Sequence, residues 1–362
     1  SREVMDKAMD KALNFLWANA PLNHKLDKKY LSTIEKNKSI LGDVIKVAQN
    51  RINAVLYGPT GEEITKDLEL ADKTCLITGA NSGIGLEMTR CLSARGCAVL
   101  MACRNTYAAG AGARAQSMWE NNHRLRLYET NLASLRSVKK CCDQILQAEK
   151  KIDIVILNAG VFGLPWTLTV DMLETSFQVN YLSQIYMLKN IEQILAPDAR
   201  VVFITSESHR SLIPTEDVVS LPESKYTSIK AYNISKLCGI LAMRYLSYCW
   251  LKTSKSVFCA HPGSFVKTRL CRNWQPYELL YTLMAPFSKN VKQAASTPLY
   301  CATSPALAGL SNLYFKECAR AEPSELAQDS HLAFRLHDLT EDIIRDRTRI
   351  LTPEEVKLDE RI

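Results

Sequence analysis

Residues 73–85 have the sequence KTCLITGANSGIG. The first six residues form a short, mostly apolar run that indicates a strand, and a helical pattern over residues 86–95 follows the glycines until Gly96 ends it. Glycines in such a turn let the backbone approach a pyrophosphate, and the amino terminus of a helix attracts an anion. An ordinary strand-to-helix turn is the alternative. Because a second strand is predicted at residues 98–102, we expect a nucleotide site here.

Strands and helices alternate from residue 72 onward, which is typical of a parallel sheet covered on both faces. The predicted fold is α/β: a doubly wound (Rossmann) seven-stranded parallel sheet with an α-helical N-terminal extension. The predicted strands begin near Lys73, Ala98, Arg124, Ile152, Arg200, Ser256 and Leu313. Two of the predicted helices span residues 171–195 and 228–251. The predicted domains are a helical N-terminal extension (1–70), a dinucleotide-binding domain (71–330) and a helical C-terminal tail (331–362).

Residues 1–57 carry two apolar stripes at helical spacing. The first includes Leu13, Leu16 and Trp17, and the second includes Val44, Ile45 and Ile52. Such stripes must be buried. They either pack against the main domain or a second subunit, as in a homodimer, or bind a protein partner or the surface of a membrane.

The amino-acid composition argues against several classes of protein. Hydrophobic residues make up 47% of the 362 residues and charged residues 23%, as in an ordinary soluble globular protein. The 12 cysteines have no disulfide-scaffold pattern or metal-ligand spacing, which favours a reducing compartment and no metal. The +7 formal charge is dispersed, which argues against nucleic acid. No spanning segment or signal peptide is visible, so we expect a cytoplasmic protein, with peripheral membrane association or a lost targeting segment left open.

Tyr232 and Lys236 lie four residues apart in a predicted helix and therefore share one face. A free phenol has a pKa of about 10, which suits proton transfer poorly at neutral pH. A neighbouring ammonium favours the phenolate and lowers that pKa, as a general acid/base requires. Taken alone, such a pair is also common on solvated helices.

The motifs together resemble the short-chain dehydrogenase/reductase family over residues 72–320. The resemblance lies in Thr78-Gly79 with Gly83-Ile84-Gly85, in Asn158-Ala159-Gly160, in the Tyr232/Lys236 pair and in His261-Pro262-Gly263. Closer resemblance is to its retinol-dehydrogenase-like branch, and within it to the oxidoreductase domains that accompany WW domains. That closer resemblance lies in Met101-Ala102-Cys103-Arg104-Asn105, Leu164-Pro165-Trp166, Thr205-Ser206-Glu207-Ser208-His209-Arg210 and Ser235-Lys236-Leu237-Cys238. Before residue 70 there is only one tryptophan, Trp17, so the front of the chain is not a WW domain.

The resemblance implies a catalytic tetrad of Asn180, Ser206, Tyr232 and Lys236. Tyr232 would exchange a proton with the substrate oxygen, and Lys236 would lower the Tyr232 pKa and hold the nicotinamide ribose. Ser206 would hydrogen-bond the substrate oxygen as its charge develops. Asn180 would kink its helix and hold a water that relays protons to Lys236.

The cofactor implied is a nicotinamide dinucleotide. Its expected binding residues are Gly79, Asn81, Ser82, Gly83, Ile84, Gly85, Arg104, Asn131, Leu132, Asn158, Ala159, Gly160, Tyr232, Lys236, Pro262 and Gly263. NADP(H) is favoured over NAD(H), because the Arg104 guanidinium suits a phosphate where an aspartate would repel it. Ser82 is the weak point, since many relatives that prefer NADP carry a basic residue there.

Three features of the sequence depart from the family pattern. Asn131 replaces an aspartate near the adenine, the interval from Ser206 to Tyr232 is long, and Thr268 lies one residue beyond its usual place. The long interval predicts an inserted loop, residues 210–227, beside the substrate. His209 is interpreted as a polar loop residue, because the nucleophile elbow of a Ser-His hydrolase is absent.

The predicted function is an NADP(H)-dependent oxidoreductase. Its substrate would be a small apolar carbonyl or alcohol, such as a retinoid, a steroid or a lipid aldehyde, bound partly by the apolar run at residues 277–284. The alternative is a catalytically weak member of the same fold that acts as a regulatory or adaptor protein through its N-terminal helices.

Overall fold

A computed structural model of the chain describes residues 58–107, 110, 124–212, 221–263 and 289–349. Residues 57–362 form one compact unit. The predicted N-terminal helices, residues 213–220 of the predicted inserted loop, Thr268 and the apolar run at 277–284 lie outside the described residues.

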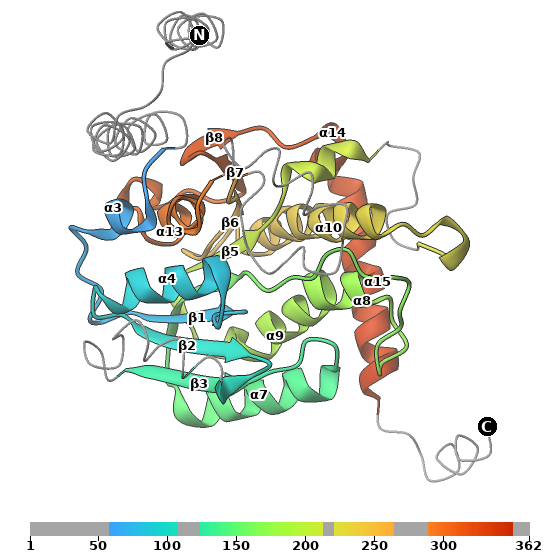
Figure 1. Cartoon of the computed structure of the whole chain (residues 1–362), viewed down its shortest axis with the longest axis horizontal. Coiled ribbons are helices and arrows are strands. Elements are labelled where there is room, and N and C mark those ends of the chain that lie inside the picture. Colours follow the sequence, from blue (N-terminus) through green and yellow to red (C-terminus); the bar gives the residue numbers. More distant parts are fainter. Residues whose placement is uncertain (1–57, 108–109, 111–123, 213–220, 264–288, 350–362) are drawn as a thin grey trace, which may run out of the picture. The chain divides into compact units, whose positions relative to one another are not determined.

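The centre of this unit is one sheet with the strand order β3-β2-β1-β4-β5-β6-β7-β8 (Figure 1). Its strands are β1 (Thr74–Thr78), β2 (Ala98–Cys103), β3 (Leu125–Glu129), β4 (Ile152–Leu157), β5 (Leu195–Ile204), β6 (Ser256–His261), β7 (Leu313–Lys316) and β8 (Ala319–Ala321). The first seven are parallel, and the connections run outward from β1 in one direction and from β4 in the other. The doubly wound fold is therefore confirmed.

An eighth strand, β8, adds an antiparallel edge that the sequence pattern did not predict. It follows β7 through a two-residue turn in which Glu317 and Cys318 have φ values of 54° and 57°. Tight hairpins need such positive φ values and usually use asparagine and glycine for them. Because Glu317 and Cys318 carry no such signal, the hairpin was not visible in the sequence.

Helices cover both faces of the sheet. One face carries α7 (Leu135–Ala148), α9 (Ser183–Ile191), α10 (Ser228–Cys249) and α15 (Ser330–Thr348), and the other carries α3 (Gly61–Thr65), α4 (Gly83–Ser93), α12 (Val291–Ala294) and α13 (Ser296–Thr303). The strands alternate between the two resulting cores. In β5, for example, Val201 and Phe203 pack into the first and Val202 and Ile204 into the second. Burial on both faces explains why the strands are almost uniformly apolar.

The helix predicted over residues 171–195 is wrong at both ends. Glu174 caps the first turn by accepting from Ser176 and Phe177, so the helix begins at α8 (Thr175–Phe177) and continues as a π-helical turn (Gln178–Leu182) into α9. At the other end β5 begins at Leu195 rather than Arg200. The missed strand residues include Pro197, which disfavours strand interiors and here lies within a register shift between β4 and β5.

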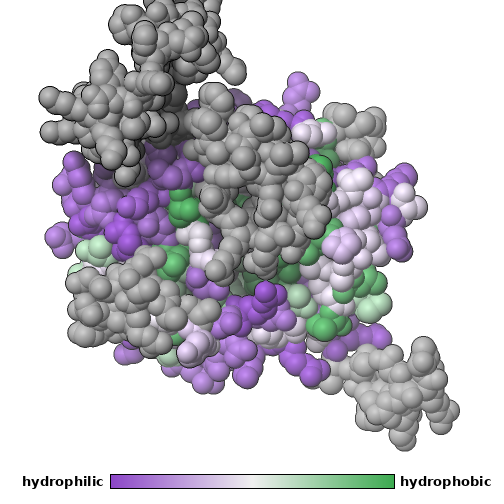
Figure 2. Space-filling model, viewed as in Figure 1, coloured by the Kyte–Doolittle hydropathy of each residue, from purple (hydrophilic) through white to green (hydrophobic). Residues whose placement is uncertain are grey.

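The C-terminal helix α15 belongs to the first core. Leu332, Leu336 and Ile344 are at most 8% exposed. Across the same interface the Tyr181 hydroxyl hydrogen-bonds Thr340 at 2.8 Å, and Lys189 forms an ion pair with Glu341. In the part of the chain that the structure describes, no helix is long and apolar enough to cross a membrane. The hydrophobic residues visible on the face shown in Figure 2 form separate patches.

We predict that Leu336→Ala lowers the free energy of unfolding by about 2–5 kcal/mol, because it leaves a cavity where the helix meets the core. Chemical denaturation monitored by circular dichroism measures this change. The matched control is Arg335→Ala, whose side chain is exposed on the same helix and should change stability by less than about 0.5 kcal/mol. Equal stabilities for the two variants would contradict the packing of Leu336 in the first core.

Candidate active site

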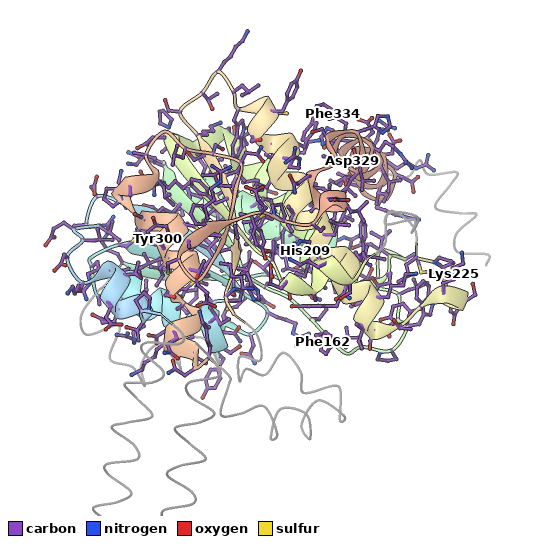
Figure 3. The ribbon with its side chains drawn as sticks, turned by 90° about the horizontal axis from the view of Figure 1, so that it is seen from above. Phe162, His209, Lys225, Tyr300, Asp329 and Phe334 are labelled. Carbon is purple, nitrogen blue, oxygen red and sulfur yellow. The ribbon has the colours of Figure 1, made fainter. Side chains whose placement is uncertain are left out.

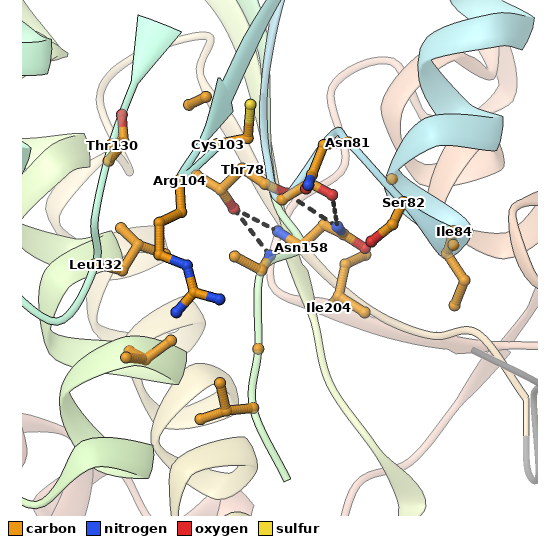
Figure 4. A pocket seen from close by; sticks show the side chains of 18 of the residues that line it. Thr78, Asn81, Ser82, Ile84, Cys103, Arg104, Thr130, Leu132, Asn158 and Ile204 are labelled. Carbon is orange, nitrogen blue, oxygen red and sulfur yellow. Dashed lines mark hydrogen bonds between the residues drawn. The ribbon is translucent and has the colours of Figure 1, made fainter. Parts of the chain in front are cut away.

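A cavity of about 410 Å³ opens at the carboxyl ends of β1, β4 and β5 (Figure 4). Ligands in doubly wound sheets bind at this edge, where the strand order reverses. All of the predicted site residues line it except Asn180, Ser206 and Gly263. The structure thus brings together residues from six segments of the sequence, namely 79–85, 104, 131–132, 158–160, 232–236 and 262.

The glycine turn after β1 forms one wall of this cavity. Gly79 and Gly83 have φ values of 66° and 55°, which other residues rarely adopt. A β-carbon on Gly85 would lie 2.3 Å from the carbonyl oxygen of Gly79 and 2.7 Å from the Asn158 amide nitrogen. Glycine at this position therefore lets the start of α4 pack directly on the ends of β1 and β4. The free N–H groups of that helix end can then face a phosphate.

Thr78 joins β1 to the turn after β4. Its hydroxyl oxygen accepts from the backbone N–H groups of Asn158 (2.9 Å) and Ala159 (3.0 Å) and donates to Gln184 Oε1 (2.8 Å). The amide nitrogen of Gln184 in turn donates to the carbonyl oxygens of Ala159 (3.0 Å) and Asn180 (2.9 Å). Gln184 is a supporting residue that the sequence analysis missed, although it lies one turn after Asn180 on the same helix.

Asn180 lies in the π-helical turn, behind Gly160. Its side-chain oxygen accepts from the Val161 N–H (2.7 Å), and its amide nitrogen donates to the Val161 carbonyl (3.0 Å) and to Ser235 Oγ (2.9 Å). A β-carbon on Gly160 would lie 3.4 Å from Asn180 Oδ1 and 3.6 Å from Lys236 Nζ. Asn180 therefore holds the loop after β4 against the helix that carries Tyr232 and Lys236.

Tyr232 and Lys236 lie on α10, which begins after Thr227 caps it by accepting from the Lys230 N–H (3.1 Å). Lys236 is buried and donates to the carbonyl oxygen of Ile204 (2.8 Å), with its Nζ 5.5 Å from the centre of the Tyr232 ring. Desolvation lowers the Lys236 pKa to about 8, so the ammonium is still mostly charged at neutral pH. The Phe162 ring packs edge-to-face on Tyr232, with 5.0 Å between ring centres.

Ser206 directly follows Thr205, which lines the cavity, and begins the short helix η3 (Glu207–Ser211). Its hydroxyl oxygen accepts from the Ser208 N–H at 3.2 Å. The interpretation of His209 as a polar loop residue is wrong, because its side chain is completely buried on η3. Its two ring nitrogens contact Ser206 O and the Ser324 N–H, which accounts for a polar residue in that position.

The far end of the cavity carries Arg104 and Asn131. Arg104 is exposed at the end of β2, and its guanidinium extends beside Leu132 in Figure 4. The Asn131 side-chain oxygen accepts from the Ala133 N–H (3.1 Å), which leaves one acceptor position on that oxygen.

Gly263 directly follows Pro262, which lines the cavity, and its φ is 114°. A β-carbon there would meet the buried side chain of Lys289, which is ion-paired with Glu317. Within the described ranges, no cluster of histidine, cysteine and acidic residues could hold a metal ion.

Comparisons with known proteins agree with this geometry. A model of the short chain dehydrogenase family matches residues 73–276. A WW domain-containing oxidoreductase of Drosophila melanogaster is 42% identical over 294 residues, which are 79% of this chain and 72% of that protein. Human retinol dehydrogenase 12 is 34% identical over 278 residues, which are 76% of this chain and 87% of that protein. The resemblance to the retinol-dehydrogenase-like branch is thereby confirmed.

Among solved structures, a protein of uncharacterised function from Mycobacterium paratuberculosis is 26% identical and aligns with a TM-score of 0.61. The alignment covers 78% of this chain and 97% of that one. Salutaridine reductase from Papaver somniferum, at 17% identity and a TM-score of 0.52, shares the fold.

We predict that Gly85→Ala weakens binding of NAD(P)H by at least about tenfold, or ~1.4 kcal/mol, because the new methyl group pushes α4 away from Gly79 and Asn158. Titration of the nicotinamide fluorescence measures the affinity. The control is Gly309→Ala, at an exposed glycine with φ at 74° and no atom within 4 Å of the added carbon. It should lower stability by about 1 kcal/mol and leave binding intact. Unchanged affinity in Gly85→Ala would place the dinucleotide elsewhere.

Proposed function

The chain belongs to the short-chain dehydrogenase family and is an oxidoreductase acting on CH–OH groups, and we propose that it interconverts a carbonyl and an alcohol on an apolar substrate with NADP(H). The observation that carries the proposal is the pairing of Tyr232 with the buried ammonium of Lys236 in the same cavity as the glycine turn. This places an acid/base group beside a surface suited to a dinucleotide.

The residues present fit a nicotinamide dinucleotide. The glycine turn offers a cradle that a β-carbon on Gly79 or Gly85 would obstruct, and Lys236 reaches the same cavity from α10. When bound, the nicotinamide supplies or accepts the hydride. Lys236 would hold its ribose, while the glycine turn would bind the pyrophosphate.

Tyr232 donates a proton to the substrate oxygen during reduction and takes it back during oxidation. Lys236 favours the phenolate through its charge, because a neighbouring cation lowers a phenol pKa. Ser206 hydrogen-bonds the substrate oxygen, which stabilises the charge that develops there. Asn180 keeps the loop after β4 in place through Val161 and Ser235. By resemblance to the family it would also hold a water that relays protons to Lys236.

NADP(H) is the proposed cofactor because of Arg104. Its exposed guanidinium at the end of β2 can pair with a ribose 2′-phosphate through two parallel hydrogen bonds. Ser82, which begins α4 without a side-chain cap, leaves that helix end open to the phosphates.

The substrate is proposed to be apolar. Val161, Leu164 and Val179 line the cavity, and Phe162 packs on the Tyr232 ring. Retinol dehydrogenases 12 and 14 are among the relatives of this chain, which supports a retinoid or a similar lipid alcohol or aldehyde.

We predict that Tyr232→Phe lowers kcat by about 10²–10⁴-fold with little change in NADPH affinity, because only the proton-transfer group is lost. Turnover of retinal, aliphatic aldehydes and steroid ketones with NADPH measures the effect. The control is Tyr248→Phe, an exposed tyrosine on the same helix, which should keep full activity. If the wild type binds NADPH but turns over none of these substrates, the result contradicts the proposed oxidoreductase and favours the adaptor function.

We predict that Arg104→Asp shifts preference from NADPH to NADH, with NADPH affinity falling by about 1.5–3 kcal/mol as a charged hydrogen bond is lost. Competitive binding of the two reduced cofactors measures the shift. The control is Arg136→Asp, which changes net charge equally at an exposed position outside the cavity lining. Equal NADPH affinity in Arg104→Asp and wild type would contradict the assignment of the phosphate to this arginine.

A further inference from the structure

The segment after Ser206 is held by polar side chains that the proposed reaction does not use. His209 Nε2 lies 3.1 Å from the backbone nitrogen of Ser324, just before α14 (Glu325–Gln328), and His209 Nδ1 lies 2.6 Å from the carbonyl oxygen of Ser206. A backbone N–H can only donate, so Nε2 must accept. The hydrogen of the neutral ring is therefore on Nδ1 and is donated to Ser206. These partners define a single tautomer.

Glu207 holds the other side of the same turn. Its carboxylate accepts from the Tyr314 hydroxyl (2.7 Å), from Lys316 Nζ (3.1 Å) and from Arg210 Nε (3.2 Å). Burial raises the pKa of Glu207, but these hydrogen bonds and the charge of Lys316 together outweigh it and lower the pKa to about 2. Tyr314 also packs edge-to-face on the His209 ring, with 5.7 Å between ring centres. The Glu207 carboxylate thus holds η3 against β7, and the His209 imidazole holds it against the segment before α14.

Ser206 needs such support because the sheet does not reach it. β5 ends at Ile204, and the last backbone hydrogen bond to β6 is made by the Thr205 N–H to Ala260 O at 2.9 Å. Beyond that point the Ser206 carbonyl accepts from the backbone N–H of His209 at 3.2 Å and contacts the His209 ring nitrogen Nδ1 at 2.6 Å, so the shorter of its two contacts comes from the His209 side chain. His209 lies in the interior of the molecule in Figure 3, whereas Lys225 and Phe334 lie near its edge.

We propose that His209 is a positioning residue for Ser206, fixing the serine backbone through an Nδ1–H hydrogen bond, while its Nε2 anchors the turn to Ser324 and Glu207 anchors it to β7. This inference rests on the proposed role of Ser206 as the group that binds the substrate oxygen. A displacement of about 1 Å at a catalytic group can cost on the order of a hundredfold in rate. A hydrogen bond to the serine backbone therefore bears on kcat although His209 does not touch the substrate.

The tautomer is tested first, because it does not depend on activity. ¹⁵N-labelled histidine in the full chain is observed by NMR at pH 7.5, and the His209 signals are assigned from their loss in His209→Asn. We expect an Nδ1–H, Nε2-acceptor ring. An Nε2–H ring or a charged ring would overturn the hydrogen-bond assignment whatever the enzyme does.

The positioning role is tested by a double-mutant cycle. His209→Leu should lower kcat by about 10- to 100-fold, with cofactor affinity within about twofold of wild type. His209→Asn places an amide N–H near the Nδ1 position and should recover part of this loss. Because His209 acts through Ser206, Ser206→Ala/His209→Leu should be no slower than Ser206→Ala alone. Losses that multiply in the double variant would overturn the proposal.

Two further measurements keep the outcomes distinct. His331→Asn, at an exposed histidine of α15, should match wild type in rate and stability. If His209→Leu does not fold, His209→Asn and Glu207→Gln replace it in the double-mutant cycle. In any of these variants, a fall in cofactor affinity equal to the fall in kcat would contradict a role confined to Ser206. If Ser206→Ala alone keeps full activity, the proposed function of Ser206 fails, while the tautomer result stands separately.

Discussion

The close approach of α4 to the ends of β1 and β4 is the constraint on which the rest of the site depends. At Gly85 three backbone segments meet with no room for a side-chain carbon, and the Asn158 amide fills the remaining space by donating to the Thr78 carbonyl at 2.9 Å. The Thr78 hydroxyl and Gln184 then fix the turn after β4 relative to β1. Thr78, Asn158 and Gln184 thus make their hydrogen bonds to the protein itself. These walls of the cavity are consequently formed before any ligand enters, which limits the entropy cost of binding.

Lys236 shows how the fold places a charge inside this framework. Removing an ammonium from water is costly, and its pKa falls as a result. The Ile204 carbonyl compensates in part, and because that carbonyl ends β5, the sheet itself positions the ammonium beside Tyr232.

Much of the fold and of the candidate site was predictable from the sequence, and the exceptions have physical causes. The glycine turn and most of the parallel strands have strong local signals, and every predicted strand start except that of β5 lies within one residue of the observed start. The strand start at Leu195, the β7–β8 hairpin and the burial of His209 were missed. Histidine and glutamate in those places have partners outside their local sequence: Ser324 lies 115 residues from His209, and Lys289 lies 28 residues from Glu317. A pattern read over a short window of sequence does not contain such contacts.

The burial of α15 has a consequence for how the protein is made. The first core contains Leu76 near the beginning of the domain and Ile344 near the end of the described chain. During synthesis the apolar side of α10 stays uncovered until residues 330–344 have left the ribosome, since their side chains complete that core. Domains tend to fold as units as they emerge. This one can complete its first core only after residues 330–344 have been translated, and until then the nascent chain exposes apolar surface to chaperones and to aggregation.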